Sequence, residues 1–325
     1  MSTNNHILVT GGAGYIGSHT CKLLSRSGYL PIVYDNLSSG HRDAVRYGPF
    51  CYGDTLDRLT LDRALAEWKP AAVIHFAACA YVGESVVSPD KYYRNNVIGL
   101  LSLLDSMRAN NVRKIVFSSS CATYGVPDQL PITEDAPQRP INPYGETKLI
   151  GEHIIRDYGR AYGIRSVALR YFNASGADRE GELAERHDPE THLIPRALMA
   201  AAGTIPHLDV FGSDYDTPDG TCIRDYIHVE DLAEGHMRAL AYMHQNEDPL
   251  QVNLGTGAGV SIREVLLAIE RASNRQVPVC MSARREGDPA ALFADPTRAR
   301  ETLGFVTKCS DIETIIASAQ KSFGL

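Results

Sequence analysis

Three side chains in the middle of the chain have types and spacing suited to moving a proton. An apolar run that begins at Lys114 ends in three hydroxyls, the last of them Ser120, and Tyr144 and Lys148 follow four residues apart. Residues four apart lie on one face of a helix, so the phenol and the ammonium are within side-chain reach of each other. Together with a hydroxyl, they can remove a proton from an alcohol if the phenol ionises near neutral pH.

Ionisation of a tyrosine at neutral pH requires a large shift of its pKa. A free tyrosine titrates at about 10, so a shift of about three units is worth about 4 kcal/mol. One cation about 4 Å away, at an effective dielectric constant of about 20, supplies about that much. Burial acts in the opposite direction, so a second positive charge would help. Lys148 is one candidate source of charge, and an oxidised nicotinamide ring is the other.

The start of the chain carries a glycine pattern suited to a dinucleotide. A short apolar strand is expected at 6–10, and a helical pattern through Leu24 follows the motif directly. Glycines at this spacing allow a tight turn, close approach to a pyrophosphate and packing of helix on strand. Asp35 ends the next predicted strand, where a carboxylate suits the hydroxyls of an adenosine ribose and repels a 2′-phosphate. The pattern therefore favours NAD over NADP. The motif residues are Gly11, Gly14, Tyr15, Ile16 and Gly17.

Strand and helix patterns alternate along the first half of the chain. Helices are expected at 59–68, 89–109 and 144–162, and strands at 71–77, 114–117 and 167–171. This alternation predicts right-handed crossovers and a parallel sheet with ligands at the carboxyl ends of its strands. We expect an α/β protein with a Rossmann-like, doubly wound parallel sheet and a smaller mixed α/β substrate lobe. The expected division is 1–172, with a return segment near 222–255, for the NAD-binding domain and 173–325 for the smaller lobe.

Several polar residues have two interpretations on sequence alone. Asp54 either closes over an adenine or is an ordinary turn aspartate. His75 lies inside an apolar strand and is interpreted as a core histidine with a satisfied ring. Asn95 and Asn96 fall in a predicted helix interior, which tolerates asparagine poorly and hints at a polar contact.

Bulk composition excludes several classes of protein. The net charge of −7 argues against a nucleic-acid binder. The chain does not open with a basic segment followed by an apolar run, and it has no stretch that approaches 18 consecutive apolar residues. We therefore expect a soluble, cytoplasmic protein without membrane contact. The seven cysteines lie far apart without a Cys-x-x-Cys pair, which predicts neither a disulfide framework nor a structural zinc site, and we expect no metal.

An anionic substrate would require local positive charge in this acidic protein. Arg224 and the pair Arg284 and Arg285 stand in loop contexts of the second half, where they suit bidentate contact with phosphate. Surface solubility explains the same residues equally well.

Taken together, the motifs resemble those of the extended short-chain dehydrogenase/reductases and, within them, the UDP-glucose 4-epimerases. The resemblance covers nearly the whole chain and implies an NAD-dependent C4 epimerase of nucleotide sugars that retains NAD through its cycle. It also implies a UDP-sugar substrate and a homodimer built from helices of the large domain. The matching segments are Val9–His19, His75–Ala77, Val82–Ser85, Phe117–Ser120, Pro143–Gly145, Leu169–Asn173, His192–Pro195, Arg224–Val229 and Arg284–Asp288.

The resemblance also assigns roles to individual residues. Tyr144 would take the sugar O4 proton while C4 gives hydride to NAD⁺, Lys148 would lower the phenol pKa and hold the nicotinamide ribose, and Ser120 would bridge to the sugar hydroxyl. The expected cofactor contacts beyond the glycine motif are Asp35, Asn36, Asp54, Phe76, Ala77, Ala78, Asn95, Ser118, Tyr144, Lys148 and Tyr171. The expected substrate contacts are Ser120, Tyr144, Asn173, His192, Leu193, Phe211, Arg224, Tyr226, Arg285, Asp288 and Leu292.

Some positions depart from the pattern of that family. Ala80 stands where many members carry a lysine or histidine near the cofactor phosphates, which predicts weaker retention of NAD. Ala184 replaces a usual glycine, and Cys121 stands where alanine is frequent, with no chemical role that we can assign. Leu292 occupies a position where a bulky residue restricts the pocket and a small one admits a 2-N-acetyl group, and leucine is intermediate.

Other activities remain open on these residues. The segment Cys121–Gly125 with Pro140–Tyr144 also resembles UDP-xylose/UDP-arabinose 4-epimerases, which use the same catalytic parts. A nucleotide-sugar 4,6-dehydratase would need an acid and a base after Ser120, where this chain has Cys121 and Ala122. A non-catalytic NAD sensor would have little need of the serine, tyrosine and lysine together.

Overall fold

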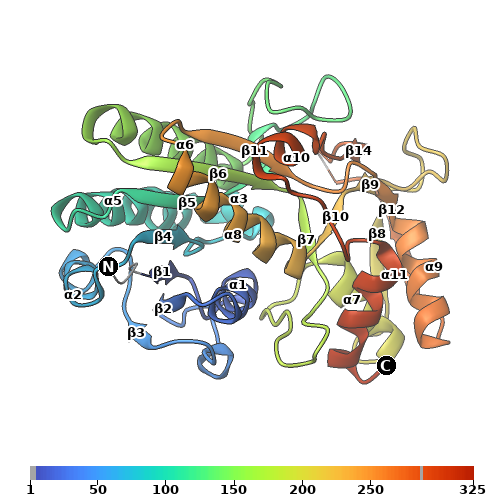
Figure 1. Cartoon of the computed structure of the whole chain (residues 1–325). Coiled ribbons are helices and arrows are strands. Elements are labelled where there is room, and N and C mark those ends of the chain that lie inside the picture. The colour runs from blue at the N-terminus through green and yellow to red at the C-terminus, as the bar shows by residue number, and fades with distance from the viewer. Residues whose placement is uncertain (1–4, 286–287) are drawn as a thin grey trace.

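A parallel sheet forms the centre of the molecule. The structure, a computed structural model, describes residues 5–285 and 288–325, so Glu286 and Gly287 of the segment Arg284–Asp288 lie outside the described residues. Within those ranges the sheet has seven strands, all paired in parallel (Figure 1). Their order is β11 (Leu250–Leu254), β6 (Arg165–Tyr171), β5 (Lys114–Ser120), β4 (Ala72–His75), β1 (His6–Thr10), β2 (Leu30–Asp35) and β3 (Phe50–Tyr52).

The strands of the sheet, except the edge strand β3, are buried at most positions, as expected for a parallel sheet with helices on both faces. Successive side chains point to opposite faces, and β1 shows this directly: Ile7 and Val9 belong to one hydrophobic cluster and Leu8 to the other. α1 and α8 pack together and supply the first cluster, while α2, α5 and α6 supply the second. These helices are α1 (Tyr15–Arg26), α8 (Val229–Gln245), α2 (Arg58–Trp68), α5 (Gly99–Ala109) and α6 (Pro143–Tyr162).

Several predicted elements differ from the structure in their limits; β5 and β6, for example, are longer than the strands expected at 114–117 and 167–171. The expected helix at 89–109 is interrupted: α4 (Pro89–Tyr92) leads into a π-helix (Tyr93–Ile98) before α5 begins. Such wider turns re-aim side chains and are frequent at functional sites. The strand expected at 71–77 is shorter, because β4 ends at His75 and the chain leaves the sheet there. A short helix, α3 (Val82–Val87), follows.

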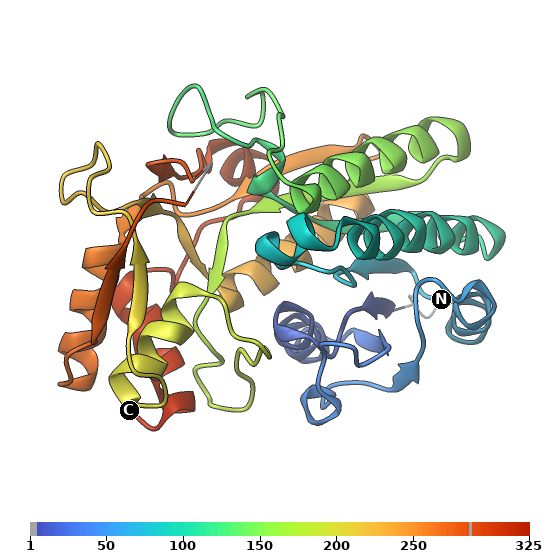
Figure 2. The same ribbon diagram turned by 180° about the vertical axis from the view of Figure 1, so that it is seen from behind.

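The rest of the chain lies beside the carboxyl end of the sheet and has its own hydrophobic cluster (Figure 2). Its small sheets pair β10 with β7, β13 with β8, and β12 and β14 with β9. The strands are β7 (Asn173–Ser175), β8 (Leu208–Phe211), β9 (Ile223–Arg224), β10 (Tyr226–His228), β12 (Val260–Ser261), β13 (Val279–Ser282) and β14 (Ala291–Leu292). The helices are α7 (Leu193–Ala202), α9 (Ile262–Ser273) and α11 (Ile312–Ala319), whereas α10 (Thr297–Leu303) packs on α8 and β11 of the large part. In the described part of the whole chain, short 3-10 helices span Arg42–Ala44 and Cys121–Thr123 in the large part and Gln320–Phe323 near the C-terminus.

The chain crosses between the two parts more than once. After β7 and the elements around α7, β10 brings it back to the sheet, and α8 and β11 then complete the large part. Asp225, between β9 and β10, anchors this crossing: its carboxylate accepts hydrogen bonds from the backbone of Thr256 (2.9 Å) and Ala294 (3.1 Å). In the part of the chain described, no helix is long and apolar enough to cross a bilayer.

Candidate active site

Ser120 is placed at the carboxyl end of β5 by a turn that it caps itself. Its hydroxyl accepts a hydrogen bond from the backbone N–H of Ala122 (3.1 Å), at the start of the Cys121–Thr123 3-10 helix. The same hydroxyl hydrogen-bonds with the phenol of Tyr144. The serine and the tyrosine, 24 residues apart in sequence, therefore lie together in the structure.

The start of α6 brings Tyr144 to this turn. Asn142 caps the helix by accepting the N–H of Gly145 (2.8 Å), and Pro143 occupies its first position. A Cβ atom on residue 145 would lie 2.4 Å from the carbonyl oxygen of Ala122. Glycine is therefore required for the helix to approach the turn this closely.

Lys148 lies one helical turn beyond Tyr144 and is buried, with 3% of its surface exposed. Its Nζ donates to the carbonyl oxygen of Ser118 (2.7 Å) and stands 5.7 Å from the centroid of the Tyr144 ring. Burial lowers the pKa of the ammonium to about 8. The lysine is thus held at the strand end beside the phenol.

The phenol of Tyr144 is not ionised by these neighbours alone. Burial raises its pKa to about 12, and the hydrogen bond from Ser120 lowers it only in part. Lowering this pKa toward neutrality stays the role predicted for Lys148 together with an oxidised nicotinamide. A further positive charge close to the ring is needed, which an oxidised nicotinamide carries.

The glycine motif has the geometry of a phosphate cradle. Gly11 has φ +73°, and a Cβ there would lie 2.6 Å from the backbone nitrogen of Ala77, so the loop lies directly against the end of β4. Gly14 caps α1 without a side-chain acceptor among the described residues, which leaves the N–H groups of the first turn, at Tyr15 and Ile16, available to an anion. This arrangement fits a dinucleotide pyrophosphate.

The acidic residue at the end of β2 is held ready for a ribose. The Asp35 carboxylate accepts the backbone N–H groups of Ala13 (2.9 Å) and Leu37 (2.8 Å), and burial raises its pKa. Nearby, Asn36 donates to the carboxylate of Asp54 (2.8 Å). Asp54 also accepts the N–H of Leu56 (2.8 Å), as a turn aspartate does. Its contact with Asn36 keeps it near the place expected for the adenine of the cofactor, so both interpretations of Asp54 remain compatible with the structure.

We predict that Gly17→Ala removes most of the bound NAD. A Cβ at this position would lie 2.2 Å from the carbonyl oxygen of Gly11, so the cradle must open to accept it. We expect at least a tenfold fall in NAD content, measured by chromatography of the nucleotide released from purified protein. Gly83→Ala is the matched control, because a Cβ there meets no described atom within 4 Å. Equal NAD content in the two variants would contradict the assignment.

The remaining expected cofactor residues lie around the same strand ends. Phe76 donates its N–H to Thr10 (2.9 Å), and Ala77 and Ala78 continue the loop after β4. Ser118 and Tyr171, on β5 and β6, share a very short hydrogen bond between their hydroxyls. As interpreted from the sequence, His75 is a core residue whose Nδ1 bonds Thr10 Oγ1 (2.7 Å).

Of the two helical asparagines, Asn96 makes the buried contacts. Its side chain bonds the backbone N–H and carbonyl of Cys79 (2.8 and 3.0 Å) and Thr147 Oγ1 (3.0 Å). It therefore ties the loop after β4 to α6, next to Lys148. Asn95, the expected cofactor contact, is half-buried and donates to Asn96 (2.9 Å).

Most of the residues expected to contact the substrate lie on the strands and loops beside the carboxyl end of the large sheet. Arg224 on β9 pairs with Asp288 (3.0 Å) and lies in register with Leu292 on β14. The guanidinium of Arg285 stacks over Phe211 at 3.8 Å. Arg284, by contrast, pairs with Asp214 (2.7 Å). Asn173 and Tyr226 lie opposite one another in the β7–β10 pair, and His192 and Leu193 stand at the start of α7.

Cys121 and Leu292 pack against one small hydrophobic cluster, which also includes Tyr124 and Phe172. Burial raises the pKa of the Cys121 thiol to about 12, so it stays protonated at neutral pH. Cys121 is therefore a packing residue beside Ser120, a role that its sequence position does not reveal.

A buried polar network behind β5 was not foreseen. Arg170 on β6 forms a double hydrogen bond with Glu152 on α6 (2.6 and 2.9 Å), and Glu152 also accepts the hydroxyl of Ser119. Arg170 reaches Tyr124 (2.9 Å), whose hydroxyl donates to Asn253 (2.7 Å). The sequence did contain a clue to this network, because an arginine inside a predicted apolar strand requires a buried partner.

A Rossmann-like sheet with a glycine cradle and a Ser-Tyr-Lys group at its carboxyl edge defines the class of short-chain dehydrogenase/reductase-like proteins. The sequence profile of the NAD dependent epimerase/dehydratase family matches residues 7–255, and the chain belongs to this family.

Similar proteins cover the chain almost completely. A UDP-glucose 4-epimerase of Rhizobium leguminosarum bv. trifolii is 54% identical over 313 residues, 96% of this chain and 95% of the relative. The crystal structure of UDP-glucose 4-epimerase from Brucella ovis in complex with NAD has a TM-score of 0.97, 62% identity and 99% coverage of both chains. That of UDP-glucose 4-epimerase from Stenotrophomonas maltophila, with NAD and formylated UDP-arabinopyranose, has a TM-score of 0.95, 36% identity and 98% coverage of both.

Proposed function

We propose that this protein interconverts UDP-glucose and UDP-galactose by NAD-dependent epimerisation at C4, through a transient 4-keto sugar. The observation that carries the proposal is the meeting of Ser120, Tyr144 and Lys148 at one strand end, within a fold whose relatives are UDP-glucose 4-epimerases. Bound NAD supplies reversible hydride transfer at the sugar C4. The places after Ser120 where a dehydratase would need carboxylates are Cys121 and Ala122, which favours epimerisation over dehydration.

The chain's own groups handle the proton and the position of the sugar. Tyr144 takes the proton from the sugar O4 and later returns it, while Ser120 keeps the phenol and the sugar hydroxyl in line. Lys148, fixed on the Ser118 carbonyl, adds positive charge beside the phenol. Ser120 and Lys148 are buried and Tyr144 is half-buried, which limits the access of water and protects the keto intermediate from escape and side reactions.

The UDP part of the substrate would lie against the smaller lobe. Arg224 and Arg285 supply the positive charge for the diphosphate. Phe211 carries Arg285 on its ring, and Leu292 stands in register with Arg224, toward the sugar. We assign the NAD-binding part to 1–172 with the return segment near 222–255, and the substrate lobe to 173–325.

The test is to incubate the purified protein, with and without added NAD, separately with UDP-galactose, UDP-xylose and UDP-N-acetylglucosamine, and to follow the sugars by NMR. We expect UDP-glucose from UDP-galactose, with a gain on adding NAD because Ala80 provides no charge near the phosphates. Reaction of the pentose alone would move the assignment to a UDP-xylose/UDP-arabinose 4-epimerase. Inversion of none of the three would refute the function.

We predict that Leu292→Ser raises the relative rate with UDP-N-acetylglucosamine. Leu292 is half-buried against the cluster around Tyr124, and a smaller residue leaves room for the acetamido group. One apolar contact of this size discriminates by about 10–200-fold, so we expect at least a tenfold change in the ratio of kcat/KM for the acetylated and plain sugars. Val306→Ser, at an exposed position, is the control. An unchanged ratio would remove Leu292 from the sugar pocket.

We also propose a cytoplasmic homodimer. The reducing compartment is supported by the seven cysteines, each of which is described and is a free thiol. The dimer is supported by exposed apolar side chains along α3 and the π-helix, namely Val86, Val87 and Ile98, beside the long helices of the large part. Light scattering coupled to size-exclusion chromatography tests it. A mass of one chain at micromolar concentration would overturn the dimer.

A further inference from the structure

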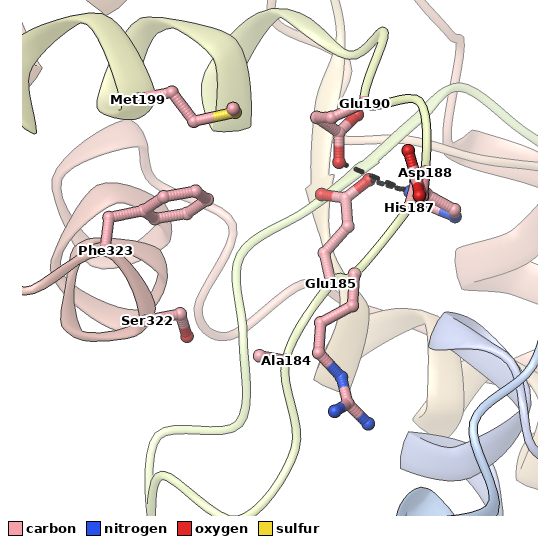
Figure 3. Close-up of a pocket in the computed structure, with 9 residues that line it drawn as sticks. Ala184, Glu185, His187, Asp188, Glu190, Met199, Ser322 and Phe323 are labelled. Atoms are coloured by element: carbon pink, nitrogen blue, oxygen red, sulfur yellow. Dashed lines mark ion pairs between the residues drawn. The ribbon is translucent and has the colours of Figure 1, made fainter. Parts of the chain in front are cut away.

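Four side chains with metal-ligating atoms converge in the connection between β7 and α7. The ligand atoms of Glu185, His187, Glu190 and His192 all lie within 4.8 Å of one another. His192 Nδ1 is 3.1 Å from Glu185 and 2.8 Å from Glu190, and His187 Nδ1 is 3.2 Å from Glu185 and 3.5 Å from Glu190. In Figure 3 the two carboxylates and His187 point toward one another.

Within the described ranges, the two carboxylates in this group pair with the two histidines and with no arginine or lysine. The side chains of Glu185 and Glu190 are only 8% and 9% exposed, and within the described ranges their ion pairs are those with the two histidines. The arginines of the segment are engaged elsewhere: Arg186 pairs with Asp43 (2.8 Å), and Arg196 lies 3.7 Å from Asp209. Buried carboxylates of this kind are paired or coordinate a metal.

A second observation points to a missing ligand. His187 Nδ1 is buried and has no hydrogen-bond partner among the described residues, although it lies 3.2 Å from a Glu185 oxygen. A nitrogen that lies 3.2 and 3.5 Å from two carboxylates without a well-aligned hydrogen bond to either can share a cation with both.

The distances between the ligand atoms indicate which kind of cation would fit. Tetrahedral Zn²⁺ with nitrogen and oxygen ligands at about 2.0–2.2 Å places neighbouring ligand atoms about 3.3–3.5 Å apart. The four measured nitrogen–oxygen separations run from 2.8 to 3.5 Å and need only small movements to match. Imidazole with carboxylate also suits transition metals, whereas Mg²⁺ and Ca²⁺ prefer oxygen ligands alone. We propose that one Zn²⁺ ion binds to Glu185, His187, Glu190 and His192 and holds the connection between β7 and α7 in place.

The position of the site gives the ion a structural role. The ring of His187 lies edge-on to the rings of Tyr15 (6.2 Å) and Tyr81 (5.8 Å), so the site joins the connection to the cofactor loop. Tyr15 also bonds the backbone of Gly176 (2.6 Å), at the other end of the connection. Glu185 and Glu190 line a cavity of about 360 Å³ between the connection and the C-terminal segment, which provides an entry path (Figure 3).

The proposal departs from the expectation of no metal, which rested on the spacing of the cysteines. The ligands here are histidines and glutamates within eight residues of one another, so cysteine spacing gave no information about them. The ion would hold His192, which caps α7, and so set the position of Leu193.

The experiment measures metal content directly. The full-length protein, purified through a tag without histidines, is treated with a chelator, equilibrated with Zn²⁺, desalted and assayed by inductively coupled plasma mass spectrometry. We expect about one Zn²⁺ per chain, and on loading with Co²⁺ a visible absorption band typical of tetrahedral coordination. Glu185→Gln and His187→Ala should each weaken Zn²⁺ binding at least tenfold.

The matched control is Glu313→Gln, the same change at an exposed position of α11. Glu313 pairs with Arg271 (3.0 Å), so its loss should leave Zn²⁺ binding unchanged. Circular dichroism verifies that each variant is folded. No retained Zn²⁺ in the wild-type protein, or equal binding by Glu185→Gln and Glu313→Gln, would overturn the site. Because none of these measurements uses turnover, the result is independent of the proposed epimerase activity.

Discussion

Tyr144→Phe is expected to lower turnover of UDP-galactose by about 10²–10⁴-fold, the contribution typical of a positioned proton-transfer group. The change removes only the hydroxyl that bonds Ser120, while the ring keeps its place 5.7 Å from Lys148. The fold and the NAD content should therefore stay normal. The initial rate and the bound nucleotide of the same preparation measure both effects.

Tyr158→Phe provides the matched control on the same helix. Its hydroxyl donates to Asp105 (2.9 Å) on α5, away from the catalytic strand ends. We expect its rate within about twofold of the wild type, because a partly exposed hydrogen bond contributes little beyond stability. Near-normal activity in Tyr144→Phe would contradict the mechanism, whereas a loss of activity in both variants would indicate a general disturbance of α6.

Glu152→Gln is expected to lower the free energy of unfolding by about 3–5 kcal/mol, the usual effect of removing one partner of a buried ion pair. The side chains of Arg170 and Glu152 are 5% and 7% exposed, so the guanidinium would be left in the interior without a counter-charge. The amide also weakens the contact with Ser119, next to the catalytic serine. Urea denaturation followed by circular dichroism measures the change.

Asp157→Asn tests whether burial, rather than charge as such, causes that effect. Asp157 pairs with Arg156 (3.0 Å) on the exposed side of α6. Exposed pairs contribute about 0–1 kcal/mol, so we expect little change in stability. Similar losses in the two variants would contradict the view that the Arg170–Glu152 pair is a special support of the site.

Local sequence rules predicted much of the fold. The alternation of strands and helices gave the parallel sheet, because each apolar run is long enough for only one kind of buried element. The element limits that were predicted wrongly have causes in tertiary packing: β4 ends at His75, where the backbone turns toward Gly11, and the helix at 89–109 takes a π turn that buries Asn96. Neither cause is visible without the packing partner.

By itself, the sequence determined which chemistry is available: a tyrosine and a lysine one helical turn apart, a serine at a strand end and a glycine cradle followed by an aspartate. These are short-range patterns, which can be recognised in a sequence because helix periodicity and turn geometry depend on nearby residues. The tertiary structure alone decided how residues far apart in sequence meet. Arg170 finds Glu152, and Arg224 finds Asp288, because the sheet order and the chain crossings bring those segments together. It also decided that burial raises the pKa of Tyr144, since desolvation depends on what surrounds the phenol and not on its neighbours in the chain.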